Sequence, residues 1–282
     1  MKGKYIYPCL ETSHDWGFIR FGGSGLANCM FVAARAYALA KKYEIPMLNP
    51  TWEKLSIGPY IRREKDKRTY SGLFDKYGIS GFKKLYFLNR SSFTEDCIDD
   101  FEKSATGVLK VVGLRNYFQD LEPRQSREFF QKIVRSNVLS VVNATDFTNK
   151  IAVHVRLGDY SEDRRVPLDW YKTMIESLLS KNKSFEFFLF SDGTDEELGV
   201  LLEIPQIKRV FFGNALADMF AISRCRMVVA SDSTFSAWGA FLGEVPIVFS
   251  KRHFPPVYKN LPEYVLGNSV ELPQELIDTL II

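Results

Sequence analysis

The sequence has few of the residues that build metal sites or disulfide frameworks. Its four cysteines are far apart and form no Cys-x-x-Cys pair, so neither a disulfide scaffold nor a zinc ribbon is indicated. The three histidines show no His-x-x-x-His spacing. No Asp-x-Asp motif stands where a metal-dependent sugar transferase would need one. We therefore expect no metal site.

The chain also lacks a strong charge and a long apolar run. A net charge of +3 over 282 residues argues against a general nucleic-acid binder. No stretch reaches the roughly 18 apolar residues that cross a bilayer, and the apolar run in the first ten residues is too short for a signal peptide. These absences favour a cytoplasmic protein that binds no nucleic acid.

What the sequence does contain is an alternation of strand and helix patterns. Strands are expected at 151–155, 185–190, 210–212, 227–230 and 245–249, with helices between them. This alternation predicts a parallel sheet with helices on both faces, that is, an α/β fold. The polar stretch 143–150 precedes it, and we expect domains at 1–148 and 149–282. The first half shows a strand at 16–21, a helix at 26–43, a strand at 45–48 and an irregular region at 49–104.

Residues 151–160, IAVHVRLGDY, deliver polar side chains to the end of a strand. Alternation places His154 and Arg156 on one face of the strand, and Asp159 follows the glycine that ends it. In open α/β sheets ligands bind at this edge. The structural alternative is a buried strand and a turn in which Arg156 pairs with Asp159.

Two further loops are expected at the same edge. The first contains Asp192, and the second, SDSTFS, opens a helix with Ser233 and Thr234. Helix N-terminal N–H groups and hydroxyls can hold a phosphate, which Arg156 can neutralise. Asp192 or Asp218 could accept hydrogen bonds from a guanine edge or from ribose hydroxyls. Together these features predict a nucleotide-diphosphate site, although an N-cap with a serine turn would also explain the second loop.

A glycine loop precedes the helix at 26–43. Gly23-x-Gly25-x-x-Asn28 superficially resembles a dinucleotide fingerprint, but the third small residue is Asn28 and the acidic residue comes too early. The loop suits a phosphate cradle. A turn required only for tight packing and an NAD site are the alternatives.

Four segments together resemble the α-1,2-fucosyltransferases, within the α-1,2/α-1,6/protein O-fucosyltransferase superfamily. HVRLGDY at 154–160 resembles the family's H-x-R-x-G-D-Y motif. GGSGLANCMF at 22–31 resembles G-G-L-G-N-Q-M-F with an inserted residue, FLFSD at 188–192 resembles its F-S-D strand, and SDSTFSAWG at 231–239 resembles N-S-S-F-S-W-W-G.

This resemblance implies a GT-B architecture, two Rossmann-like domains facing a cleft, with the nucleotide sugar on the C-terminal domain and the acceptor on the N-terminal one. It also implies an inverting transferase that uses GDP-fucose and needs no metal or other cofactor. The implied binding residues are His154, Arg156, Asp218, Ser233, Thr234, Phe235, Gly23, Gly25 and Asn28.

The expected reaction is direct transfer of L-fucose to a hydroxyl of a glycan, here an α-1,2 transfer to a galactoside. Arg156 would stabilise the departing GDP, and Asp159 is the candidate general base, unless it only holds Arg156. A lipid-linked acceptor would add contact with a membrane surface. The alternatives are another GDP-sugar or α-1,6 transferase, and a non-catalytic protein that binds a nucleotide sugar or a glycan.

Overall fold

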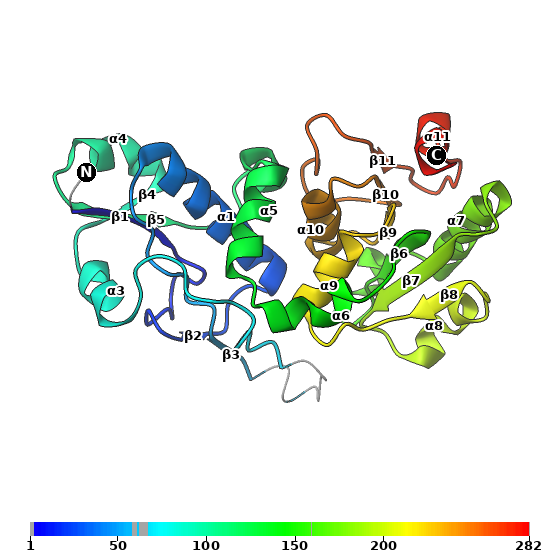
Figure 1. Cartoon of the computed structure of the whole chain (residues 1–282), viewed down its shortest axis with the longest axis horizontal. Coiled ribbons are helices and arrows are strands. Elements are labelled where there is room, and N and C mark those ends of the chain that lie inside the picture. Colours follow the sequence, from blue (N-terminus) through cyan, green and yellow to red (C-terminus); the bar gives the residue numbers. More distant parts are fainter. Residues whose placement is uncertain (1–2, 58–60, 62–66, 159, 282) are drawn as a thin grey trace. The chain divides into compact units, whose positions relative to one another are not determined.

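The computed structural model describes residues 3–57, 61, 67–158 and 160–281. The chain divides into two compact units, unit 1 with residues 1–138 and unit 2 with residues 139–282. The expected boundary followed residue 148. The short helix α6 (Ser140–Asn143) lies before that point and groups with unit 2, because it contacts α9 (Ala215–Ile222). Figure 1 labels the helices and strands of both units.

Unit 1 is built on a small parallel sheet whose strand order is β1-β5-β4. A second, two-stranded parallel sheet is formed by β2 and β3. The strands are β1 (Lys4–Pro8), β2 (Arg20–Phe21), β3 (Lys54–Leu55), β4 (Ser92–Thr94) and β5 (Gly107–Val111). The helices are α1 (Leu26–Tyr43), α3 (Gly81–Leu88), α4 (Ile98–Lys103) and α5 (Pro123–Ile133), with single 3-10 turns η1 (Glu95–Cys97), η2 (Tyr117–Asp120) and η3 (Ser136–Leu139).

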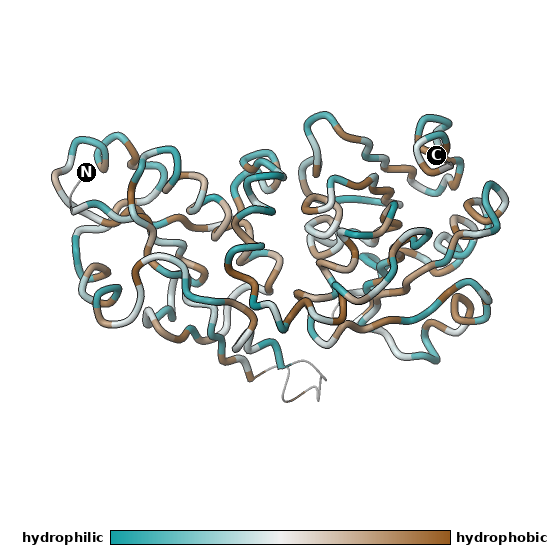
Figure 2. The backbone as a smooth tube through the Cα atoms, in the orientation of Figure 1, coloured by the Kyte–Doolittle hydropathy of each residue, from teal (hydrophilic) through white to brown (hydrophobic). Residues whose placement is uncertain are grey.

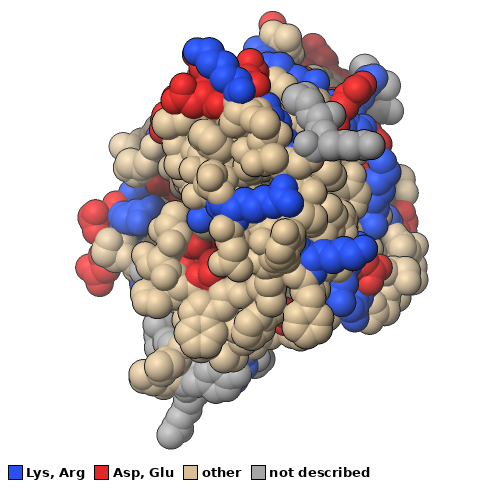
Figure 3. Space-filling view, turned by 90° about the vertical axis from the view of Figure 1, so that its left-hand side faces the viewer, with Lys and Arg blue, Asp and Glu red and all other residues tan. Residues whose placement is uncertain are grey.

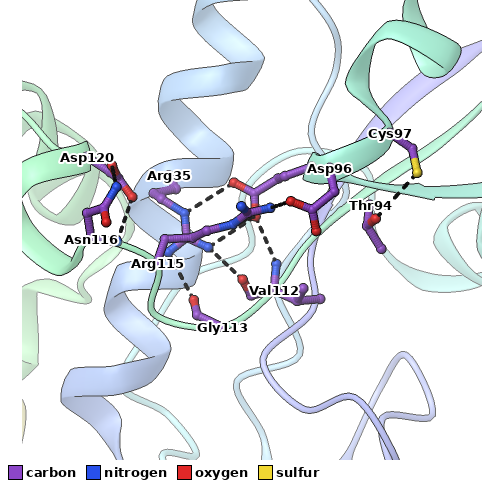
Figure 4. A network of polar contacts seen from close by, with 10 residues as sticks. Arg35, Thr94, Asp96, Cys97, Val112, Gly113, Arg115, Asn116 and Asp120 are labelled. Carbon is purple, nitrogen blue, oxygen red and sulfur yellow. Dashed lines mark hydrogen bonds and ion pairs between the residues drawn. The ribbon is translucent and has the colours of Figure 1, made fainter.

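Helix α1 is the central helix of unit 1. Its alanines favour helix, and it packs against β1, β5 and α5. The buried Arg35 fixes it in place: the guanidinium donates to both oxygens of Glu95, at 3.3 and 3.2 Å, and to the carbonyls of Val112 and Gly113 (Figure 4). Arg115 adds a second cation to Glu95 at 3.7 Å. The helix is therefore anchored to the loop after β5 by charge-assisted bonds as well as by apolar contact.

Unit 2 holds a six-stranded sheet in which every neighbouring pair is parallel, in the order β11-β10-β9-β6-β7-β8. The strands are β6 (Lys150–Val155), β7 (Glu186–Ser191), β8 (Ile207–Arg209), β9 (Val228–Ala230), β10 (Ile247–Phe249) and β11 (Glu263–Val265). The helices are α6, α7 (Leu168–Lys181), α8 (Asp195–Leu202), α9, α10 (Thr234–Gly243) and α11 (Gln274–Ile281), with one 3-10 turn η4 (Glu162–Arg164).

Helices cover both faces of this sheet. One core joins Ile151, Val153 and Val155 of β6 to buried side chains of α7, α8 and α11. The opposite face carries His154, which contacts α10, and α10 packs on α9. Strands buried on both faces read as nearly continuous apolar runs, and the tube along β7 is coloured hydrophobic over much of its length (Figure 2).

The structure confirms the parallel sheet and the helix at 26–43. Three expectations were wrong in part. The strand expected at 16–21 is reduced to β2, since Gly17 has φ +82°. The strand at 210–212 lies earlier, as β8, because the Phe212 N–H donates to Asp218. Residues 45–48 form isolated bridges only.

The irregular region at 49–104 contains the helices α3 and α4, which the sequence reading missed, as it missed β1, β11 and α11. Within the described part of the chain, no helix is both long enough and apolar enough to cross a bilayer.

Candidate functional site

The expected cation–carboxylate cluster is present where β6 and β7 end. Arg156 follows β6, and its Nη1 lies 3.0 Å from Asp192 Oδ2, just after β7. Both side chains keep part of their surface exposed, 22% and 26%. Asp159 lies outside the described residues, and among those described the carboxylate paired with Arg156 belongs to Asp192. The pairing links the loop after β6 to the loop after β7.

Asp192 is held by the backbone as well as by Arg156. Its Oδ1 accepts the N–H groups of Leu157 and Gly158 at 2.9 and 3.1 Å. Burial alone would raise the pKa of Asp192, but Arg156 and these two N–H groups outweigh burial and lower it. A Cβ on Gly158 would lie 2.7 Å from Asp192 Oδ2, so glycine is required for this close approach. Asp192 therefore holds Arg156 in place.

His154 lies beneath the cluster and is buried. Its Nδ1 is 3.0 Å from Ser236 Oγ and 2.9 Å from Ser231 Oγ. Burial, followed by the charge of Arg156, lowers the pKa of His154 to about 3. The imidazole is therefore neutral at physiological pH. Its ring centroid is 5.2 Å from that of Phe235, which ties β6 to the start of α10.

The loop SDSTFS at 231–236 forms the N-terminus of α10, as expected. Ser233 is the N-cap, and its Oγ accepts the Phe235 N–H at 3.3 Å. Thr234 and Phe235 are half-buried in the first turn. This cap is the structural role that the sequence also allowed. The remaining N–H groups of the first turn and the helix dipole still favour an anion at this end.

Sequence reasoning missed an aspartate–histidine pair beside this loop. The buried Asp232 accepts the backbone N–H of His253 at 2.9 Å, and its other oxygen contacts His253 Nδ1. The His253 side chain is 63% exposed. Tyr160 donates its hydroxyl to the Asp232 carbonyl at 2.9 Å, and the Arg156 guanidinium lies 5.5 Å from the Tyr160 ring centroid. The only sign of this pair in the sequence is the aspartate in the SDSTFS loop. Its partner, His253, lies 21 residues further along the chain.

Asp218 has a structural contact of its own. It lies on α9, and its Oδ1 accepts the Phe212 N–H at 2.7 Å. This bond fixes the segment after β8 to α9. The contact with guanine that the resemblance implies for Asp218 stays a prediction.

In unit 1 the glycine loop leads into α1 as expected, with Gly25 as the N-cap. Gly23 has φ +79°, a conformation that favours glycine. Two buried cations lie behind the loop: Lys54 Nζ donates to the Gly23 carbonyl at 2.9 Å, and Arg20 Nη1 donates to the Gly22 carbonyl at 3.3 Å. Burial, followed by the charge of Arg20, lowers the pKa of Lys54.

The surroundings of the loop suit an anion. A Cβ on Gly25 would meet no described atom within 4 Å, so the space beside it is open. Asn28 is half-buried in the first turn of α1. The loop therefore combines a helix N-terminus with positive charge. Whether it meets the same ligand as Arg156 stays a prediction, because the two belong to different units.

The sequence and the fold resemble those of known proteins. No protein-family model matches the sequence. The chain is 24% identical over 247 residues to an α-1,2-colitosyltransferase from Escherichia coli, covering 77% of this chain and 84% of that protein. Among solved structures, the fucosyltransferase NodZ from Bradyrhizobium matches with a TM-score of 0.55 at 16% identity, over 88% of this chain and 94% of NodZ.

The chain has the GT-B glycosyltransferase fold. The structure of NodZ α-1,6-fucosyltransferase soaked with GDP-fucose matches with a TM-score of 0.52 at 16% identity, over 87% of this chain and 94% of that one. The relatives are glycosyltransferases, in agreement with the enzyme class expected from the sequence. In this GT-B protein the polar cluster of unit 2 lies at the carboxyl edge of the six-stranded sheet, where ligands of open α/β sheets bind.

Proposed function

We propose that this protein is an inverting glycosyltransferase that transfers L-fucose from GDP-fucose to a hydroxyl of a glycan, in α-1,2 linkage to a galactoside. The observation that carries the proposal is Arg156, held by Asp192 at the carboxyl edge of the sheet beside the N-terminus of α10. A guanidinium and a helix N-terminus together suit a diphosphate. The similarity to a glycosyltransferase sequence supports the reaction class.

The proposed reaction is a single displacement. The acceptor oxygen attacks C1 of the fucosyl group, the bond from C1 to the β-phosphate oxygen breaks, and GDP leaves with that electron pair. Arg156 stabilises the charge that develops on the leaving phosphate, and the hydroxyl proton passes to a general base. We propose that no metal takes part, so that transfer persists in a chelator.

A second candidate keeps the site and changes the donor sugar. The sequence relative is an α-1,2-colitosyltransferase, which favours a colitosyl donor as the alternative and also supports the α-1,2 linkage. A direct comparison of GDP-fucose and GDP-colitose as donors, at equal concentration and with the same acceptor, distinguishes the two candidates.

The test of the proposed function is substitution of Arg156. We expect Arg156→Ala to reduce kcat for transfer from GDP-fucose about 10²- to 10³-fold, the range found when one transition-state donor is removed, and Arg156→Lys to restore only part of the rate because lysine lacks the planar fork. The exposed Arg124 of α5 is the matched control, and Arg124→Ala is expected to transfer fucose at the wild-type rate. Undiminished transfer by Arg156→Ala would contradict the proposal.

The general base has two candidates, Asp159 and His253. Asp159 comes from the sequence motif. His253 is supported by its contact with Asp232, which occupies Nδ1 and so directs Nε2 to other partners. Asp159→Asn and His253→Gln are compared by their profiles of kcat/KM against pH. Loss of the acidic limb identifies the base, because that limb reports the group that must be deprotonated.

A further inference from the structure

Unit 1 exposes four large aromatic side chains on two segments that pack together. Trp16 and Phe18 lie in the loop before β2, and Phe82 and Tyr86 lie on α3. Their exposed fractions are 58%, 63%, 91% and 66%. We call these four residues the aromatic patch. Single exposed apolar side chains are common on soluble proteins, whereas a group of them marks an interaction surface.

The loop before β2 and the helix α3 are held against each other by close packing. A Cβ on Gly17, which separates the two aromatic residues of the loop, would lie 2.6 Å from Leu85 Cδ2 and 3.2 Å from Leu88 Cδ1. Gly17 has φ +82° and donates its N–H to Asp15 Oδ1 at 2.8 Å. Glycine is therefore required for this approach, which holds the two loop aromatics beside the helix.

The outward side of α3 combines aromatic rings with basic groups. Phe82 and Tyr86 are four residues apart, so they lie on one side of the helix, and both are exposed. Lys83 is exposed beside them. Arg90 follows the helix and is half-buried, with its guanidinium 5.6 Å from the Tyr86 ring centroid. The helix therefore presents aromatic rings that are flanked by cations.

The segment around α3 carries charge of one sign. Residues 76–94 contain four basic residues, Lys76, Lys83, Lys84 and Arg90, and no aspartate or glutamate. Figure 3 shows the side of unit 1 on which α3 lies in Figure 1. Uncharged side chains cover most of this side, and charged side chains of both signs are set among them. A basic helical segment with apolar side chains on its outer face is typical of proteins that lie on a membrane surface.

We propose that the aromatic patch docks unit 1 on an anionic membrane surface, with its rings among the lipid headgroups and with Lys83 and Arg90 near lipid phosphates. Aromatic side chains favour this interfacial region, and each lysine or arginine near an anionic surface strengthens binding about 5-fold. A second copy of the chain fits this face less well, because a symmetric contact would bring the basic groups of both copies together. The inference goes beyond the proposed function and does not depend on the donor or the linkage.

The test is co-sedimentation of the full-length protein with lipid vesicles. We expect the protein to bind vesicles made of equal parts of phosphatidylcholine and phosphatidylglycerol, and to bind pure phosphatidylcholine vesicles about 10-fold more weakly. The double variant Phe82→Ser, Tyr86→Ser is expected to lose about 10-fold or more in affinity for the anionic vesicles. Phe211→Ser is the matched control: it removes an aromatic residue of unit 2 that is 60% exposed, and we expect it to bind as the wild type does.

The contribution of charge is measured with a second pair of variants. Lys83→Gln is expected to bind the anionic vesicles about 5-fold more weakly. Lys181→Gln, at an exposed position on α7, is expected to bind as the wild type does. Raising the ionic strength from about 0.1 M to about 1 M shortens the Debye length from about 10 Å to about 3 Å. We expect this change to weaken binding of the wild type more than binding of Lys83→Gln.

Three results would overturn the inference. They are a wild type that stays in the supernatant with both kinds of vesicle, equal affinity of the double variant and Phe211→Ser for the anionic vesicles, and a wild type that is dimeric where the double variant is monomeric. In the last case a second copy would cover the patch. Because Phe82 and Tyr86 are exposed, we expect the double variant to unfold at the wild-type midpoint. The test measures no transfer, so its failure leaves the proposed function standing, and loss of the proposed function leaves the docking surface standing.

Discussion

At the scale of single residues, the site depends on a few polar groups that fix one another. Asp192 orients Arg156 while accepting two backbone N–H groups, and Gly158 leaves room for its carboxylate. Such pairs combine positioning with charge compensation, since each partner lowers the cost of burying the other. His154 differs, because it is buried as a neutral ring whose Nδ1 contacts two serine hydroxyls.

The burial of neutral His154 predicts a loss of stability in mild acid. The pKa of His154 is lowered to about 3 in the folded protein, against about 6.5 in an unfolded chain. The unfolded state therefore takes up the proton first, and the contribution of this group, complete above pH 6.5, is lost as the pH falls toward 3. One unit below pH 6.5 the loss is about 1 kcal/mol.

The measurement is urea unfolding of wild type and His154→Gln at pH 7.5 and 5.5. We expect the wild type to lose about 1 kcal/mol more than the variant over this interval, even if the variant is less stable throughout. Parallel losses in the two proteins would show that His154 is not the group responsible.

Single residues also show which parts of the site could be predicted from the sequence. The strand that ends just before Arg156 and the helix that starts after Ser233 were predictable from local patterns. The partner of Arg156 did not, because Asp192 is brought beside it by the pairing of β6 with β7. The pair of Asp232 and His253 was missed for the same reason: neither residue has a local pattern that predicts the contact.

At the scale of elements, the long alanine-rich helix α1 was predictable, and the short helices α3 and α4 were not. Helix α1 has the expected bounds, since 18 residues of helix propensity accumulate. The helices α3 and α4 have eight and six residues, and isolated helices of that length are marginal. Their stability comes from tertiary packing, as with α4 against β4 and β5, which local sequence does not reveal.

The anchor of α1 gives a prediction at this scale. Arg35 is 5% exposed and Glu95 13% exposed, and Arg35 also satisfies two carbonyls (Figure 4). Arg35→Leu leaves the Glu95 carboxylate with the Val112 N–H at 3.3 Å and the more distant Arg115 as its recorded partners. We therefore expect the free energy of unfolding to fall by about 3 kcal/mol. Equilibrium unfolding in guanidinium chloride measures this change in the free energy of unfolding.

Two variants test the cause of that loss. Lys42→Gln, at an exposed position on the same helix, is expected to unfold at the wild-type midpoint. The double variant Arg35→Leu, Glu95→Leu removes the stranded charge and is expected to recover part of the stability. A double variant less stable than Arg35→Leu would indicate that the packing of Arg35, rather than its charge, matters most.

At the scale of the whole molecule, the chain consists of two units with separate sheets and separate cores. Sequence alternation predicted the sheet of unit 2, where strands and helices follow one another at short intervals. The sheet of unit 1 was not predictable in this way, because β1 and β5 pair across about a hundred residues. The roles of the units, nucleotide sugar on unit 2 and acceptor on unit 1, stay predictions.

Hydrogen exchange tests these roles in the intact protein. A ligand that binds the folded state at 100 times its dissociation constant stabilises what it binds by about 2.7 kcal/mol. If GDP binds at Arg156 and the N-terminus of α10, exchange in β6, β7 and β9 slows by up to about 100-fold, with a smaller change in β1 and β5. UDP at the same concentration is expected to protect less, and Arg156→Ala is expected to lose most of the effect of GDP. Equal protection of β1 and β6 would contradict the assignment of the nucleotide to unit 2, because the two strands belong to separate cores that can open independently.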